Sequence, residues 1–203
     1  MPSRDDGSLA QQLRQATKAD HHRVDHHPAL RHLLRPDVNR AIYGAALTCL
    51  YPAAAGLERT LSQTIVEYKS HYTLTLREPL LGHDLRKLGQ PVLPAWRFSA
   101  PASLYEMVGM LYVHEGSRLG GEAIACHAKR ALGDQIPSRF FSEMPLTPAA
   151  WAGFWQFAEA MCPRDSWPWV IQGAQQAFRE FTEALTNALP ATTTPPLALV
   201  PTE

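Results

Sequence analysis

Seventeen prolines are spread along the 203 residues, and most of them separate segments rich in Ala, Leu, Gln, Glu and Arg. Proline lacks a backbone N–H and cannot continue a helix interior or a central strand, so these positions act as boundaries. Within the segments, apolar residues recur every three or four positions, and no alternating β-branched run exceeds a few residues. The pattern predicts an all-α, single-domain bundle of six helices at roughly 8–27, 37–68, 72–89, 101–132, 147–162 and 166–189.

Composition excludes several classes of protein. Nineteen Lys and Arg balance nineteen Asp and Glu, so the chain lacks the net positive charge typical of nucleic-acid binding. Three cysteines at wide spacings form neither a disulfide framework nor a C-x-x-C motif, which indicates a reducing, cytoplasmic setting. Neither a signal peptide nor a membrane-spanning run is recognisable. We expect a flexible N-terminus over 1–7, a helical domain over 8–189 and a disordered Pro/Thr-rich tail over 190–203.

The fourth predicted helix contains four glycines, Gly109, Gly116, Gly120 and Gly121. Each glycine costs about 0.5–1 kcal/mol relative to alanine in a helix interior, so the set requires a reason. Three of them fall on one stripe with Ala123, where either a second helix or a ligand could approach the bare backbone. The adjacent pair Gly120 and Gly121 predicts a bend in the helix.

Histidines are concentrated near the N-terminus, where five of the nine lie between residues 21 and 32. At about 100° per residue, His21 falls at the flank of the apolar stripe of the first helix, whereas His22 points to its polar side. His21 is therefore a candidate inward-facing ligand, although a histidine in such a position is often an ordinary surface or core residue. The i, i+4 pairs His21/Asp25 and His22/His26 leave zinc binding as an alternative, but no further ligand completes a structural zinc site.

Two motifs resemble those of the heme oxygenase family. The stretch LRQATKADH, from Leu13 to His21, resembles the proximal-helix signature. The stretch YVHEGSRLGG, from Tyr112 to Gly121, is similar to the distal-helix motif of the bacterial branch found alongside bacterial phytochromes. The segments RFF (139–141) and AFREFTEAL (177–185) fit the later helices of the family more loosely. The resemblance covers nearly the whole chain except the tail.

The resemblance implies a helical bundle in which heme lies between the first helix and the kinked distal helix, with His21 as the axial ligand of the iron. Gly116, Gly120 and Gly121 would let the backbone lie close over the heme, and Gly116 and Gly120 would steer dioxygen sideways and leave room for ordered water. Arg14 and Lys18 match positions where the family places basic residues near the heme propionates.

The activity implied is oxidative cleavage of heme to biliverdin, carbon monoxide and ferrous iron. Heme would be both cofactor and substrate, with O2 and electrons supplied by an external ferredoxin or flavoprotein reductase. The branch that the distal motif resembles also suggests a bacterial phytochrome as the acceptor of biliverdin.

The distal motif departs from the family pattern at two positions. Ser117 stands where many members carry an Asp that organises distal water; a hydroxyl can also hold water, so Ser117 is a candidate catalytic residue. His114 replaces a residue that is more often apolar, and it lies about 200° from the glycine face, which predicts a packed or surface histidine. We expect the neighbouring Glu115 to bond another helix.

Two other functions remain open at this stage. A heme carrier or sensor with the same fold would bind hemin without degrading it. A thiaminase-type enzyme would share the helical architecture and use a cysteine nucleophile, although Cys126 is expected to be a small buried residue. The tryptophans Trp151, Trp155, Trp167 and Trp169 are expected to be core and interface aromatics.

Overall fold

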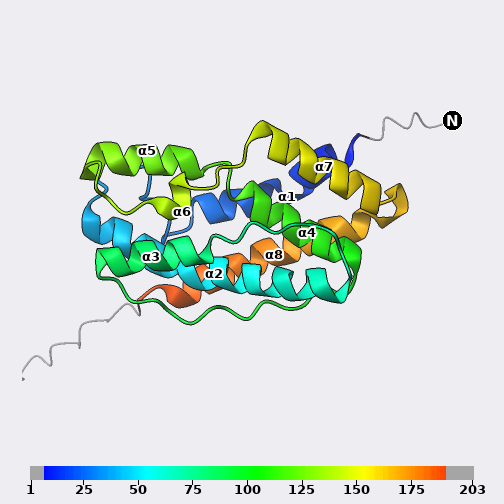
Figure 1. The fold of residues 1–203 in the computed structure, drawn as a ribbon, viewed down its shortest axis with the longest axis horizontal. Helices are drawn as coiled ribbons and strands as arrows, with labels where there is room; N and C mark the ends of the chain where they lie inside the picture. The colour runs from blue at the N-terminus through cyan, green and yellow to red at the C-terminus, as the bar shows by residue number, and fades with distance from the viewer. Residues whose placement is uncertain (1–6, 191–203) are drawn as a thin grey trace, which may run out of the picture.

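The computed structural model describes residues 7–190, and residues 1–6 and 191–203 lie outside the described part. Regular structure in residues 7–190 is entirely helical, which confirms the predicted all-α domain. The elements, shown in Figure 1, are α1 (Leu9–Asp25), α2 (Arg40–Glu67), α3 (Glu78–Leu88), α4 (Leu104–Gly116), α5 (Gly121–Leu132), α6 (Arg139–Ser142), α7 (Pro148–Met161), the 3-10 turn η1 (Arg164–Ser166) and α8 (Trp167–Ala188). The predicted flexible N-terminus and disordered tail fall almost wholly outside the described residues.

The ends of several helices follow local sequence signals. Ser8 precedes α1 and its side chain accepts a hydrogen bond from the backbone N of Gln11 at 3.3 Å. Gly133 ends α5 with a φ of 93°, a conformation that a residue with a side chain rarely adopts. The boundaries of α1, α2, α7 and α8 agree with the predicted segments to within three residues.

Two predicted helices need correction. The segment 72–89 becomes helical only at Glu78, because Pro79 suits the first turn of a helix and not its interior, and because Glu58 of α2 accepts the first backbone N–H groups. The segment 101–132 is divided into α4 and α5 by a turn at Ser117–Gly120. The predicted count of six helices is therefore too low, since the short elements α6 and η1 were also missed.

The core is built around α8. This helix packs against α1, α2 and α4, and Figure 1 shows it running through the centre of the bundle. Fully buried side chains come from each of these helices and from α3, including Leu13, Leu47, Leu85, Leu111 and Leu185. Burial of such side chains supplies about 1.5–3 kcal/mol each. As a result, α1 and α4, which carry the motifs that resemble those of heme oxygenases, both pack on α8.

The contact between α4 and α8 explains one of the four glycines. A Cβ atom added to Gly109 would lie 2.6 Å from the backbone N of Ala174 and still closer to the carbonyl oxygen of Val170. A Cβ on Gly173 of α8 would meet the backbone of Glu106 in the same way. The two helices therefore cross with backbone against backbone, and close helix packing is the correct interpretation for Gly109.

The longest described helices are α2, with 28 residues, and α8, with 22. Both carry polar side chains along their length, such as Glu58 in α2 and Glu180 in α8. No helix among residues 7–190 combines the length and the apolar character needed to cross a membrane.

Candidate functional site

His21 lies in the last turns of α1, with 61% of its side chain exposed. Its Nδ1 is 2.9 Å from Oδ2 of Asp25, one helical turn later, and its ring makes an edge contact with Phe178 of α8 at a centroid distance of 6.0 Å. A carboxylate on Nδ1 fixes the ring orientation and leaves Nε2 as the nitrogen that can bind a metal ion. The arrangement therefore suits coordination of a metal ion outside α1 by Nε2 of His21.

The neighbouring histidines are placed differently. His22 is exposed, and its ring stacks on His26 with centroids 3.9 Å apart. His27 is buried, lies within hydrogen-bond distance of Thr186 at 3.1 Å, and has a pKa lowered by burial. Among residues 7–190, no cluster of three or more His, Cys, Asp or Glu side chains could hold a metal ion. The inward orientation expected for His21 is therefore not found, since both His21 and His22 are exposed; the two differ in that only the His21 ring contacts α8, through Phe178.

The bend predicted at the adjacent glycines is present. Helix α4 ends at Gly116, Ser117–Gly120 form a turn, and α5 begins at Gly121. A Cβ added to Gly116 or Gly120 would have no heavy atom within 4 Å, so both positions border open space. A Cβ on Gly121 would lie 2.9 Å from the carbonyl oxygen of Phe141 in α6. Gly116 and Gly120 therefore present free backbone, whereas Gly121 faces α6.

The helix that carries His21 and the helix that precedes the turn Ser117–Gly120 pack on the same neighbouring helix and run in the same direction. Both α1 and α4 pack on α8, and Figure 1 shows the two helices running in the same direction, so that their C-terminal ends point to the same side of the molecule. The exposed side chains of Arg14 and Lys18 lie on α1, two turns and one turn before His21. The bundle thus places the imidazole of His21 on α1 and the turn Ser117–Gly120, called the glycine turn below, directly after α4.

The hydroxyl of Ser117 is held by two groups. It donates a hydrogen bond to the carbonyl oxygen of His114 at 2.7 Å and accepts one from Nη2 of Arg77 at 2.6 Å. Its single hydrogen is therefore used in the bond to His114, and only one oxygen lone pair remains for another partner. Ser117 can accept a hydrogen bond from water but cannot donate one while this arrangement holds.

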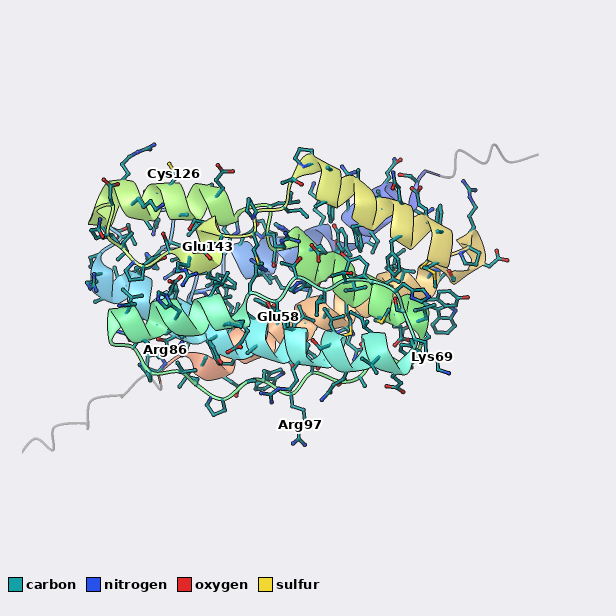
Figure 2. All side chains as sticks on the ribbon, viewed as in Figure 1. Glu58, Lys69, Arg86, Arg97, Cys126 and Glu143 are labelled. Atoms are coloured by element: carbon teal, nitrogen blue, oxygen red, sulfur yellow. The ribbon has the colours of Figure 1, made fainter. Side chains whose placement is uncertain are left out.

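Arg77 is a buried residue that the motifs did not reveal. Its backbone N donates to both carboxylate oxygens of Glu58 at 3.0 Å, and its guanidinium lies 4.7 Å from the ring centroid of Phe140. Burial lowers the pKa of Arg77 to about 10 and raises the pKa of Glu58. Glu58, labelled in Figure 2, is buried. No local pattern in the sequence connects residues 58, 77 and 117, so only the fold brings them together.

His114 is a packed histidine, as expected. It is 2% exposed, and its Nε2 donates to the carbonyl oxygen of Thr75 at 3.0 Å. Burial, and secondarily the positive charge of Arg77, lower its pKa to about 3. The side chain is therefore neutral at physiological pH and is part of the packed interior.

We expect His114 to make the fold sensitive to acid. The native side chain takes up a proton only near pH 3, whereas the unfolded chain does so near the ordinary value of 6.5. Between these values the unfolded state binds more protons, so the free energy of unfolding falls as the pH is lowered, by up to about 1.4 kcal/mol per pH unit. Urea unfolding at pH 7, 6 and 5 should show a shallower pH dependence for His114→Gln, whose amide can still donate to Thr75. Equal slopes for the variant and the wild type would contradict the assignment.

Cys126 lies elsewhere than expected. Cys126 is exposed on the outer face of α5, because the buried stripe of that helix passes through Ala125 and Ala128. Trp151 and Trp155 pack on Tyr112 at centroid distances of 6.1 and 5.8 Å, as predicted for core aromatics. Trp169 is 51% exposed.

Comparison with known proteins shows the family of the chain. Residues 7–187 match the sequence profile of the family described as heme oxygenase. The chain belongs to the heme oxygenase family. A heme oxygenase from Xanthomonas campestris pv. campestris (strain 8004) is 35% identical over 150 residues, which are 70% of this chain and 88% of that protein.

Solved heme oxygenases share the fold at lower identity. The NO- and CO-bound heme oxygenase of Neisseria meningitidis is similar with a TM-score of 0.67 and 22% identity, covering 96% of this chain and 99% of that one. Heme oxygenase-1 of the cyanobacterium Synechocystis sp. PCC6803, solved in complex with heme, gives a TM-score of 0.62 and 19% identity over 89% of this chain and 92% of that one. These likenesses confirm the predicted heme oxygenase-like bundle.

Proposed function

We propose that this heme oxygenase binds its substrate between α1 and the turn after α4, with Nε2 of His21 as the axial ligand of the heme iron. The observation that carries the proposal is the pairing of an exposed imidazole, held at Nδ1 by Asp25, with two glycines whose missing side chains leave open space. Membership of the family makes the chain an enzyme that degrades heme to biliverdin. Carbon monoxide and ferrous iron are the other proposed products, with O2 as the oxidant.

The backbone at Gly116 and Gly120 contributes open space to the proposed site and no charged group. With nothing within 4 Å of a Cβ at Gly116 or Gly120, a planar macrocycle can lie directly against the backbone there. The remaining lone pair of Ser117 would accept a hydrogen bond from a water molecule at this face, which supports its proposed role in ordering water for proton delivery. Gly121 would contribute indirectly, by letting α5 lie close to Phe141 of α6.

Charge near the entrance would orient the substrate. Arg14 and Lys18 are exposed on the helix that carries His21, where their cationic groups can pair with the two heme propionates. We further propose a ferredoxin or flavoprotein reductase as the electron donor, a bacterial phytochrome as an acceptor of biliverdin, and the cytoplasm as the place of action.

The test is a hemin titration followed by turnover in the same cuvette. Saturable one-to-one binding should produce a Soret band. Ascorbate added in air with catalase should then bleach this band while far-red biliverdin absorbance grows. A Soret band that persists under these conditions would instead indicate a heme carrier or sensor, and absence of saturable binding would remove the site altogether.

A further inference from the structure

Arg118 is a charged residue in the middle of the glycine turn, between Ser117 and Leu119. Both neighbours are exposed, yet only 8% of the Arg118 side chain is accessible. Its guanidinium therefore passes behind the turn into the protein, on the side away from solvent.

The guanidinium uses every donor it has. Nε and Nη2 donate to the carbonyl oxygen of Met144 at 3.1 and 2.9 Å, and Nη2 also donates to that of Pro145 at 3.3 Å. Nη1 donates to Oγ1 of Thr75 at 3.3 Å and to the carboxylate of Glu115. These five contacts match the five N–H donors of an arginine, so none remains for a bound ligand. The expectation that Glu115 bonds another helix is therefore wrong, because its charged partner is Arg118, three residues later in the adjoining turn.

The partners of Arg118 belong to three separate parts of the chain. Glu115 lies in the last turn of α4, Thr75 lies in the extended linker before α3, and Met144 and Pro145 lie in the loop after α6. Met144 has a φ of 55°, a conformation that costs a residue with a side chain free energy, and its side chain is exposed. What the loop contributes at this position is its carbonyl oxygen, which receives two of the five hydrogen bonds.

We propose that Arg118 is a positioning residue that fixes the height of the turn Ser117–Gly120 over the heme face. The inference rests on the proposed function, because it assigns the turn to the substrate site. Gly116 and Gly120, at the two ends of the turn, give its backbone the freedom to shift. The hydrogen bonds of Arg118 to the linker before α3 and to the loop after α6 remove that freedom. A lysine could not replace the arginine. The planar guanidinium binds the Met144 carbonyl and the Glu115 carboxylate through different nitrogens, and a lysine has only one ammonium group.

The first test uses the protein without hemin. Hydrogen exchange of the backbone amides of residues 116–121 should be about tenfold faster in Arg118→Lys than in the wild type, and faster still in Arg118→Met. Arg139→Met is the matched control, because it removes an exposed arginine whose ion pair with Glu143 lies within α6 and its end. Its exchange at the turn should be unchanged. Exchange that is unaltered at the turn, or raised equally throughout the chain, would overturn the proposal.

The second test uses the hemin complex. In Arg118→Lys the affinity for hemin should stay within about threefold of the wild type, while the isomer composition of the biliverdin formed should change, since a shifted turn alters where oxygen is directed. An unchanged isomer composition would count against a positioning role. If the wild type itself forms no biliverdin, the proposed function fails, and the exchange measurement still decides whether Arg118 holds the turn.

Discussion

Replacement of His21 by alanine should abolish imidazole coordination of hemin and lower the rate of biliverdin formation on the order of 100-fold or more. The reason is that the Asp25 contact at 2.9 Å prepares this imidazole alone among the exposed histidines of α1. The visible spectrum of the ferric complex reports the coordination directly, and ascorbate-driven turnover reports the rate. Because the variant removes side-chain atoms that are mostly exposed, its thermal stability should remain close to that of the wild type.

His22→Ala is the matched control, since the residue is adjacent on the same helix and its ring stacks on His26 instead. Its hemin spectrum and turnover should equal those of the wild type. Addition of free imidazole should partly restore the spectrum of His21→Ala, because it can occupy the vacated coordination position. Retained turnover in His21→Ala, or a loss of coordination in His22→Ala, would show that the axial ligand is a different residue.

Replacement of Gly109 by alanine should destabilise the protein by about 3 kcal/mol or more. The new Cβ would lie 2.6 Å from the backbone N of Ala174, and backbone atoms cannot move aside as a flexible side chain can. Helices α4 and α8 would have to separate, and α8 also supports α1 and α2. A loss of this size lowers the melting temperature of a chain of this length by roughly 6–12 °C, which differential scanning calorimetry measures.

Gly116→Ala is the contrasting substitution on the same helix. With no heavy atom within 4 Å of the new Cβ, the protein without hemin should melt at the wild-type temperature or slightly above it. Its affinity for hemin should fall, because the methyl group enters the space proposed for the macrocycle. Equal melting temperatures for the Gly109 and Gly116 variants would contradict the division of the glycine stripe into a packing part and a substrate part.

Much of the fold was predictable because it depends on local signals. The cap at Ser8, the stop at Gly133 and the bend at Gly120–Gly121 each act over a few residues, and each is present in the structure. The start of α3 was predictable only in part, because Pro79 is a local signal but is not the whole cause. It depends on the carboxylate of Glu58, which reaches the chain 19 and 20 residues later.

The candidate site was predictable in its motif residues and not in their support. Sequence spacing placed Gly109, Gly116 and Gly120 on one stripe, but only the position of α8 decides that Gly109 meets a helix while the other two meet open space. Likewise, Ser117 could be proposed as a water-binding residue, whereas its bond to Arg77 joins residues 40 positions apart. Long-range contacts of this kind leave no periodicity in the sequence.

The central place of α8 also constrains when the site can exist during synthesis. Of the described helices it is the last to leave the ribosome, yet α1 and α4 both rest on it. A nascent chain that ends before Trp167 holds His21 and the glycine turn on helices that have no common partner. Domains generally fold as units once their last contacts become possible. We therefore expect the proposed heme site to form only after α8 has been synthesised, so that a growing chain would not hold heme before the enzyme is complete.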